Sequence, residues 1–285
     1  MNEPELTPYP IRGFWKLALY VVLVGYAVIV VYPMFWLIAT SFKDSWGIFK
    51  NPWALPEKLN WINFYNAWVK AQLGHKFLNS LIVDVSALFF ILLLSANAAY
   101  VLARFDFPGN KIIFYLFLSG MALPVFMLII PLFILMQQMH LLNTRIGLIV
   151  VYTVYSLSFT IFVLRGFFRT LPRELAEAAL IDGCSPFGVY WKIMLPLAKP
   201  GLVTAGIFVF IGLWNEYPLA LVLCNLDQLQ TLPLGIASLT MTLKYQSDWG
   251  ALFAGLTIVV IPTVIIYSLF QKQIQAGLTT GAVKG

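Results

Sequence analysis

The chain carries few charged residues. Asp, Glu, Lys and Arg make up only 11% of its 285 residues, whereas 60% are hydrophobic and the mean hydropathy is +0.84. A typical soluble domain carries about 25% charged residues, so this composition excludes an ordinary soluble fold. Side chains this apolar require an apolar solvent, and the sequence therefore predicts an integral membrane protein.

Cysteine and histidine are also scarce. Cys184 lies in a charged segment and Cys224 at the end of an apolar run, which gives no basis for a disulfide framework. His75 and His140 stand apart, which argues against a metal site. The chain has no GxxxxGK motif followed by Ser or Thr, no HExxH and no GxSxG. We therefore expect a chain that is not an enzyme and needs no metal or cofactor, with any ATP hydrolysis on a partner.

Six apolar runs are long enough to cross a bilayer, which requires about 20 residues. They cover residues 17–40, 77–103, 112–139, 146–164, 201–223 and 249–271. The first run is longer than the core of a signal peptide and no small-residue cleavage site follows it, so we expect a permanent helix. The sequence therefore predicts an all-α polytopic membrane protein with six transmembrane helices, formed by residues 1–285 as a single domain.

The net charge of +6 is consistent with membrane topology rather than nucleic-acid binding. Most of the Lys and Arg residues fall in the cytoplasmic segments if both termini lie in the cytoplasm, as the positive-inside rule requires. The first outer loop contains Trp46, Trp53, Trp61 and Trp68. Indole rings favour the membrane–water interface, so we expect this loop to lie on the membrane surface.

The segment 165–200 separates the fourth and fifth runs and is predicted to be cytoplasmic. Its first part has the pattern of a short helix. Thr170 is a suitable N-cap, and Pro172 fits the first turn. Glu174 and Glu177 follow early in the helix, where carboxylates interact favourably with the positive end of the helix dipole.

A turn and a second short helix follow. Gly183 is predicted to end the first helix as a left-handed C-cap. Ser185 and Pro186 are typical of a new helix start, and Pro196 is predicted to end that helix. The second helix contributes a set of large apolar side chains: Phe187, Tyr190, Trp191, Ile193 and Met194. A hairpin this small cannot bury all of them, so it either folds back on its own bundle or partly faces a partner.

The spacing of residues within this hairpin resembles the signature loop of ABC-importer permeases, which reads EAA, three residues, G, nine residues, I-x-LP. The matching positions are Glu177, Ala178, Ala179, Gly183, Ile193, Leu195 and Pro196, with Asp182 before the glycine. The resemblance implies the transmembrane domain of a type I importer, in which the first short helix is a coupling helix bound in a groove of an ATPase subunit. Glu174 is assigned to the same coupling surface. The resemblance further implies that Glu177 pairs with a basic group or accepts hydrogen bonds on the ATPase surface, and that the two alanines permit close docking.

Further segments are similar to carbohydrate-type permeases. They are FLNSLIV at 77–83, AAYVLARFDFPGNK at 98–111 and LWNEYPLAL at 213–221. The end of the chain, GLTTGAVKG at 277–285, resembles the carboxyl-terminal tail of maltose-transporter-like permease subunits. Asp84 departs from this pattern, because a small or apolar residue is expected there. Its place near the outer end of its run predicts contact with interfacial water.

The resemblance implies an assembly in a prokaryotic inner membrane. A second permease subunit, two cytoplasmic ATP-binding subunits and an extracytoplasmic solute-binding protein are the expected partners, together with membrane lipid. Closure of the ATPase pair is expected to move the coupling helices as rigid levers and to switch the permease pair between inward-facing and outward-facing states. The expected substrate is a sugar or an oligosaccharide.

Polar residues within the fifth run are candidates for the translocation path. Pro218 leaves the carbonyl of Trp214 without its usual donor, which predicts a kink there. Two interpretations of Asn215 and Glu216 stay open: they face the translocation path, or they join a hydrogen-bond network between helices.

Other function classes explain the sequence less well. An ion-coupled secondary transporter would use Glu216 and Asp84 as coupling carboxylates, but it predicts inverted repeats, which are not evident, and it leaves the hairpin without a purpose. A membrane enzyme lacks a recognisable set of catalytic residues. An importer of glycerol phosphate or a related polyol remains an alternative. A phosphate-bearing substrate favours basic residues in the path, however, and the six runs contain none, which favours an uncharged sugar.

Overall fold

The computed structural model describes residues 13–246 and 248–282. Within these ranges the chain is helical and contains no strand, which confirms the predicted all-α fold.

The helices follow one another with short connections. From the amino end they are α1 (Gly13–Thr40), α2 (Ser45–Lys50), α3 (Ile62–Tyr65), the π-helix η1 (Asn66–Lys70), α4 (Leu73–Arg104), α5 (Asn110–Gly120), α6 (Val125–Gln138) and α7 (Arg145–Thr170). They continue with α8 (Glu174–Ile181), α9 (Pro186–Val189), the π-helix η2 (Tyr190–Met194), α10 (Leu195–Leu197), α11 (Lys199–Trp214), α12 (Pro218–Leu223), the 3-10 helix η3 (Asp227–Leu229), α13 (Leu232–Gln246) and α14 (Trp249–Ala282).

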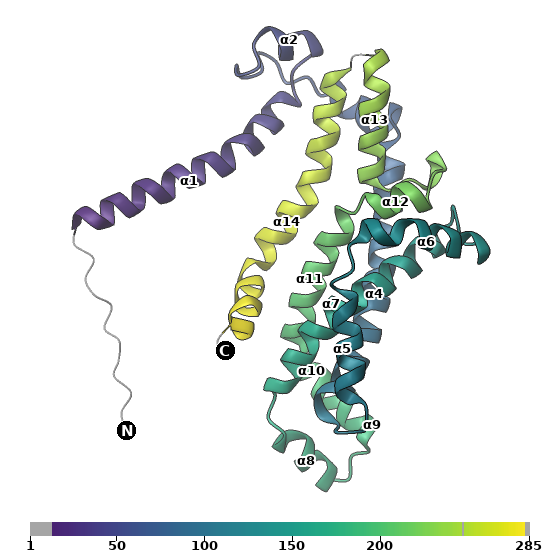
Figure 1. The fold of residues 1–285 in the computed structure, drawn as a ribbon. Coiled ribbons are helices and arrows are strands. Elements are labelled where there is room, and N and C mark those ends of the chain that lie inside the picture. The colour runs from purple at the N-terminus through teal and green to yellow at the C-terminus, as the bar shows by residue number, and fades with distance from the viewer. Residues whose placement is uncertain (1–12, 247, 283–285) are drawn as a thin grey trace.

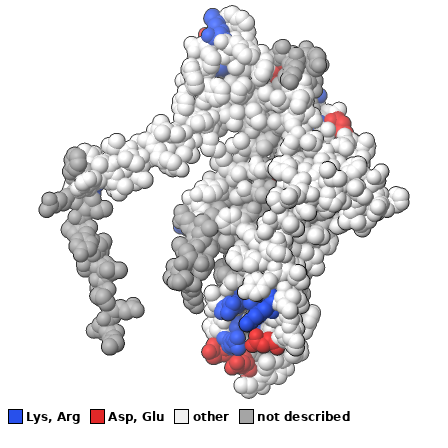
Figure 2. Space-filling view, viewed as in Figure 1, with Lys and Arg blue, Asp and Glu red and all other residues white. Residues whose placement is uncertain are grey.

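Four of the described helices, α1, α4, α7 and α14, are each long and apolar enough to cross a membrane. Two bent pairs reach the required length only together: α5 with α6, and the α9–α10 segment with α11. The described part of the chain therefore accounts for up to six spans. Charged side chains gather at the two ends of the face seen in Figure 2 and leave a broad band between them without Asp, Glu, Lys or Arg. This distribution fits a protein surrounded by lipid.

The third apolar run does not form one helix. α5 and α6 are separated by four residues and bent by 98° relative to each other. Pro124 has an extended backbone at the N-cap of α6 and no N–H to continue the preceding helix. The proline therefore separates the two helices, whereas Pro131 lies inside α6.

The centre of the bundle is formed by α4 and α7, which pack along each other. An apolar cluster joins Ile91 of α4, Tyr152 of α7 and Leu219 of α12, each at most 1% exposed. α11 packs against α4, α7 and α14. Trp214 at the end of α11 is buried, and its Nε1 donates to the carbonyl oxygen of Val259 in α14 at 3.1 Å. These contacts make α4, α7, α11 and α14 one packed unit.

Helix α1 diverges from this unit. In Figure 1 it leaves the upper end of the bundle and extends away from it, and its apolar stretch is not buried by the rest of the described chain. Contacts occur near its carboxyl end, where Trp36 lies 5.5 Å from Phe253 between ring centroids and donates to the carbonyl oxygen of Pro52 at 2.8 Å. The helix is thus anchored at one end only.

The four tryptophans of the segment after α1 are all partly exposed. Trp46, Trp53 and Trp61 are each more than 60% exposed, and Trp68 is 43% exposed. The Trp53 ring packs on Trp36 of α1 at 5.8 Å. Exposed indole rings at this end of the bundle agree with a segment at the membrane surface.

Polar contacts fasten the connection between α12 and α13 at the end of the bundle that carries α2. Lys76 forms an ion pair with Asp227 at 2.8 Å. Asn79 Nδ2 donates to the carbonyl oxygens of Gln228 and Gln230, and Asn79 Oδ1 accepts from the Arg145 guanidinium at 2.7 Å. These bonds give a physical role to the FLNSLIV segment.

α13 follows this connection and packs against α4 and α14. No helix was predicted there from the sequence.

Candidate functional site

The segment after α7 forms two short helices joined by a tight turn. α8 ends in a Schellman motif, in which the N–H of Cys184 donates to the carbonyl oxygen of Ala179 at 2.9 Å and the N–H of Gly183 to that of Leu180 at 3.1 Å. Gly183 has a φ of +83°, a left-handed conformation that costs other residues free energy. The predicted C-cap at Gly183 is confirmed.

The second short helix also starts as predicted. Ser185 Oγ accepts from the N–H of Gly188 at 3.1 Å, and Pro186 occupies the first turn. Its predicted end at Pro196 is wrong. This proline lies in the first turn of α10, where a missing N–H costs little, and the chain bends by 68° between α10 and α11, at Ala198.

The first short helix begins later than predicted. α7 continues to Thr170, whose hydroxyl donates back to a carbonyl of the same helix, so this residue does not cap α8. α8 begins at Glu174, and its N-cap residue Arg173 makes no side-chain cap. The last turn of α7 stays helical because Phe168 is fully buried in the bundle. Residues 165–170 of the predicted loop therefore belong to a long helix.

The hairpin of α8, α9, η2 and α10 is fastened to the ends of α4 and α7. The ring of Tyr190 lies 4.8 Å from that of Tyr100 in α4, which lies 5.5 Å from the ring of Phe168 in α7. Arg104 Nη2 donates to the carbonyl oxygen of Leu171 at 2.7 Å and holds the connection between α7 and α8. The hairpin therefore folds back on its own bundle, as one of the two interpretations of the sequence describes.

The structure divides the predicted coupling residues into two groups. The exposed ones are Glu174, Glu177, Ala178, Asp182, Gly183 and Pro196. Ile193 and Leu195 are half-buried and Ala179 is 6% exposed, all three within the cluster beneath the hairpin. Ala179 therefore allows α8 to approach its own bundle closely, whereas Ala178 lies on the open face.

Two large apolar side chains stand on that open face. Ile181 at the end of α8 is 86% exposed and Phe187 in α9 is 73% exposed. They lie in the same hairpin as the exposed carboxylates of Glu177 and Asp182. An exposed apolar surface next to charged groups is typical of a docking site for another protein. Ile181 was not singled out in the sequence, although it directly precedes the Asp–Gly pair.

The fifth apolar run is interrupted around Glu216, between α11 and α12. Glu216 Oε1 accepts from the N–H of Leu219 at 2.7 Å, and Oε2 accepts from that of Ala220 at 3.1 Å and from the hydroxyl of Tyr152 at 2.6 Å. The kink predicted at Pro218 is a complete break, with Pro218 as the first residue of α12. Glu216 thus caps α12 and joins it to α7, as the network interpretation describes.

The neighbouring polar residues differ in their surroundings. Asn215 is exposed, and its Nδ2 donates to the carbonyl oxygen of Ile211 in its own helix at 2.8 Å. Asp84 is 1% exposed, and its Oδ2 has no hydrogen-bond partner among the described residues. The expectation that Asp84 reaches interfacial water is therefore wrong, because α4 buries it near Glu216 and Tyr152.

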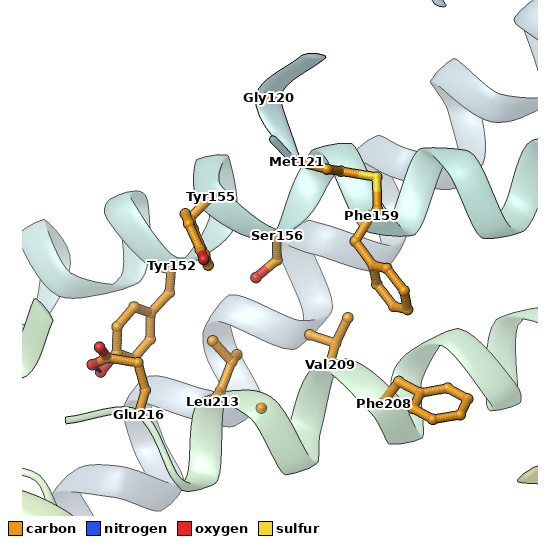
Figure 3. A pocket seen from close by; sticks show the side chains of 11 residues that line it. Gly120, Met121, Tyr152, Tyr155, Ser156, Phe159, Phe208, Val209, Leu213 and Glu216 are labelled. Carbon is orange, nitrogen blue, oxygen red and sulfur yellow. Dashed lines mark hydrogen bonds between the residues drawn. The ribbon is translucent and has the colours of Figure 1, made fainter. Parts of the chain in front are cut away.

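A cavity of about 280 Å³ lies between α7 and α11, beside the break between α5 and α6. Figure 3 shows Tyr155, Ser156 and Phe159 of α7 facing Phe208 of α11 across it, with Glu216 at one end. The described residues that line the cavity include no Lys, Arg or His. It combines aromatic surface with a few hydroxyl and carboxylate oxygens, as small-molecule sites commonly do.

Sequence reasoning missed the α7 side of this cavity. Tyr152, Tyr155, Ser156 and Phe159 lie at positions i, i+3, i+4 and i+7, which places them on one face of a helix. In an apolar run of tyrosines and phenylalanines this spacing does not stand out. The feature of the sequence that could have identified this face is the recurrence of hydroxyl groups along it.

Residues 91–280 match the family model described as the inner membrane component of binding-protein-dependent transport systems. The chain belongs to this family. It is a multi-pass inner-membrane permease, and the resemblance of its hairpin and flanking segments to ABC-importer permeases is confirmed.

The permease is similar over nearly its whole length to sugar-transport permeases. It is 44% identical over 263 residues to the diacetylchitobiose uptake system permease protein NgcG of Streptomyces coelicolor, covering 92% of this chain and 87% of that protein. It is 34% identical over 274 residues to the trehalose transport system permease protein SugB of Mycobacterium tuberculosis, covering 96% and 98%.

A solved structure has the same fold. The permease superposes with a TM-score of 0.80 on a chain of a bacterial ABC transporter involved in the import of the acidic polysaccharide alginate. The match covers 93% of this chain and 99% of that chain, at 22% sequence identity. The match shows that the two chains share their overall fold.

Tyr152→Phe is expected to destabilise the permease, because it removes the hydrogen bond between α7 and the Glu216 carboxylate. A buried hydrogen bond to a charged group contributes about 1.5–3 kcal/mol. Thermal unfolding of the detergent-purified permease measures the effect. Tyr155→Phe is the matched control, since the structure gives its half-exposed hydroxyl no hydrogen bond to the described residues. Equal unfolding temperatures for the two variants would show that the Tyr152 bond does not hold α7 to α12.

Proposed function

We propose that the permease forms half of the translocation path of an ATP-driven importer for an uncharged sugar or oligosaccharide. The observation that carries the proposal is the hairpin: a short helix with exposed carboxylates and apolar side chains, fastened to the two central spans. The relatives named for uptake of diacetylchitobiose and trehalose support the substrate class.

α8 acts as the coupling helix. Glu177 pairs with a basic group on a cytoplasmic ATP-binding subunit, and Ala178 permits close approach to its surface. Ile181 and Phe187 lose their exposed apolar area on docking, which favours binding by about 25 cal/mol per Å². Asp182 and Gly183 set the turn to the second short helix.

The end of the bundle that carries α8 faces the cytoplasm, and both termini lie on that side. Figure 2 supports this orientation, because basic side chains gather at that end of the molecule next to α8. Lys111, Arg165, Arg169 and Arg173 line one pocket, and Arg173 is the N-cap residue of α8. Cytoplasmic ends of membrane spans carry such an excess of Lys and Arg.

The cavity between α7 and α11 belongs to the translocation path. The faces of Tyr155, Phe159 and Phe208 suit the apolar faces of a sugar ring, while Ser156 and Glu216 offer oxygen atoms to its hydroxyl groups. The exposed Asn215 lies next to Glu216 at the same break. The absence of a basic residue among the described lining residues supports an uncharged substrate over a phosphate ester.

The permease works with a second permease subunit, two ATP-binding subunits and an extracytoplasmic solute-binding protein. The unburied apolar length of α1, held only at its carboxyl end, is available to pack against the second permease. The solute-binding protein docks at the opposite end from α8, over α2 and α13. ATP closes the two ATP-binding subunits, α8 follows, and the spans fastened to the hairpin move with it.

Gly183→Val is expected to abolish import while the bundle still folds. A β-branched side chain at a φ of +83° costs about 1–2 kcal/mol and changes the angle between α8 and α9. Uptake of labelled sugar by cells with equal amounts of each variant measures this. Gly166→Val, at a helical position where an added Cβ meets no atom within 4 Å, is the control. Normal import by the Gly183 variant would contradict the coupling role.

The energy source is tested with the complex purified from its native membrane and reconstituted in proteoliposomes. Import is expected to require both ATP on the side of the ATP-binding subunits and the solute-binding protein on the other side. It is expected to persist when an ionophore removes proton and sodium gradients. Import that continues without ATP and stops with the ionophore would establish an ion-coupled transporter instead.

A further inference from the structure

A basic pocket lies where α4 turns into α5, next to the end of α7. It has a volume of about 460 Å³. Its charged lining residues are Lys111, Arg165, Arg169 and Arg173, with Asp106 as the single acidic residue. The cations come from three places in the chain: the start of α5, the last turns of α7 and the N-cap of α8. Figure 2 shows basic side chains gathered near the lower end of the bundle.

Asp106 compensates only part of the positive charge of this pocket. No carboxylate in the described part of the chain forms an ion pair with any of the four cations. Arg165 donates one hydrogen bond from Nε to the carbonyl oxygen of Leu102 at 3.1 Å, and its guanidinium carbon lies 3.8 Å from the centre of the Phe114 ring. These contacts hold Arg165 in place and leave its other N–H groups without an acceptor among the described residues. Arg165 and Arg169 also repel each other.

The pocket lies at the ends of two helices that are long and apolar enough to cross a membrane, where lipid headgroups are expected. α4 ends at Arg104 and α7 at Thr170. The uncharged part of the lining includes Leu102, Phe107 and Ile112, and Ile112 is 67% exposed on the outside of the bundle. A concave group of cations with an apolar rim, at the ends of two long apolar helices, suits a ligand with an anionic head and apolar chains.

We propose that this pocket binds the phosphate group of an anionic phospholipid. Arginine is well suited to bidentate contact with phosphate oxygens, and Arg169 and Arg173 offer complete guanidinium groups. A bound phosphate ties the start of α5 to the end of α7 and to the N-cap of α8. The lipid thereby stabilises the position of α8 relative to α5 and α7. Free inorganic phosphate shares the same chemistry, and the experiment below distinguishes the two sources.

The test uses the whole transport complex in detergent, followed by native mass spectrometry after exchange into equal amounts of phosphatidylglycerol and phosphatidylcholine. The wild type is expected to retain phosphatidylglycerol in preference to phosphatidylcholine. Arg169→Gln/Arg173→Gln is expected to lower that preference about thirty-fold, as loss of two cations near a membrane surface implies. Lys192→Gln/Lys199→Gln removes two exposed cations outside the pocket lining, at the same end of the molecule, and is expected to leave the preference unchanged.

A second measurement keeps the proposal falsifiable if the double variant is unstable. The thermal stability of the wild-type complex in phosphatidylcholine nanodiscs is expected to rise when phosphatidylglycerol is included, and not when inorganic phosphate is added. Stabilisation by inorganic phosphate alone would overturn the lipid assignment. Loss of the ATP-binding subunits from the Arg169/Arg173 variant in every lipid would also overturn it, since the cations would then serve protein docking. Equal retention of both lipids by the wild type would exclude the site.

Discussion

The ring contacts of Tyr100 with Tyr190 and with Phe168 are the contacts on which the proposed mechanism depends. Helices as short as α8 and α9 are not stable alone in water. They persist here because the apolar side of the hairpin is buried against the ends of α4 and α7, with Met194 fully enclosed. Since α4 and α7 also form the centre of the bundle and α7 borders the cavity, the proposed mechanism transmits a force on α8 directly to one wall of the cavity.

Breaks in the helices place polar side chains and free backbone groups within the membrane. Backbone groups freed by a break must find partners, because lipid supplies none. At the break after α11, the Glu216 carboxylate takes up two N–H groups of α12 and the hydroxyl of Tyr152. One side chain therefore caps a helix, joins two spans and forms one end of a cavity. The break between α5 and α6, at Pro124, borders the same cavity.

Local signals in the sequence predicted much of this structure, and the rest depends on contacts that sequence spacing does not reveal. Apolar length predicted the spans, Gly183 the left-handed turn and Ser185 the second helix start. The predicted cap at Thr170 failed because burial of the preceding turn extends α7. The environment of Asp84 and its proximity to Tyr152 arise from packing between distant helices, and so could not be predicted from either residue's neighbours.

Rigid coupling of the hairpin to the spans is tested most directly by distance measurements between spin labels in the complete transport complex. With the native cysteines replaced, labels are placed at the exposed Leu175 on α8 and at the exposed Phe162 on α7, with and without ATP. A rigid lever requires an unchanged distance between these two sites, while the distance from Leu175 to a label on the second permease changes. A change between Leu175 and Phe162 that leaves the two permeases in place would show that the hairpin moves on its own.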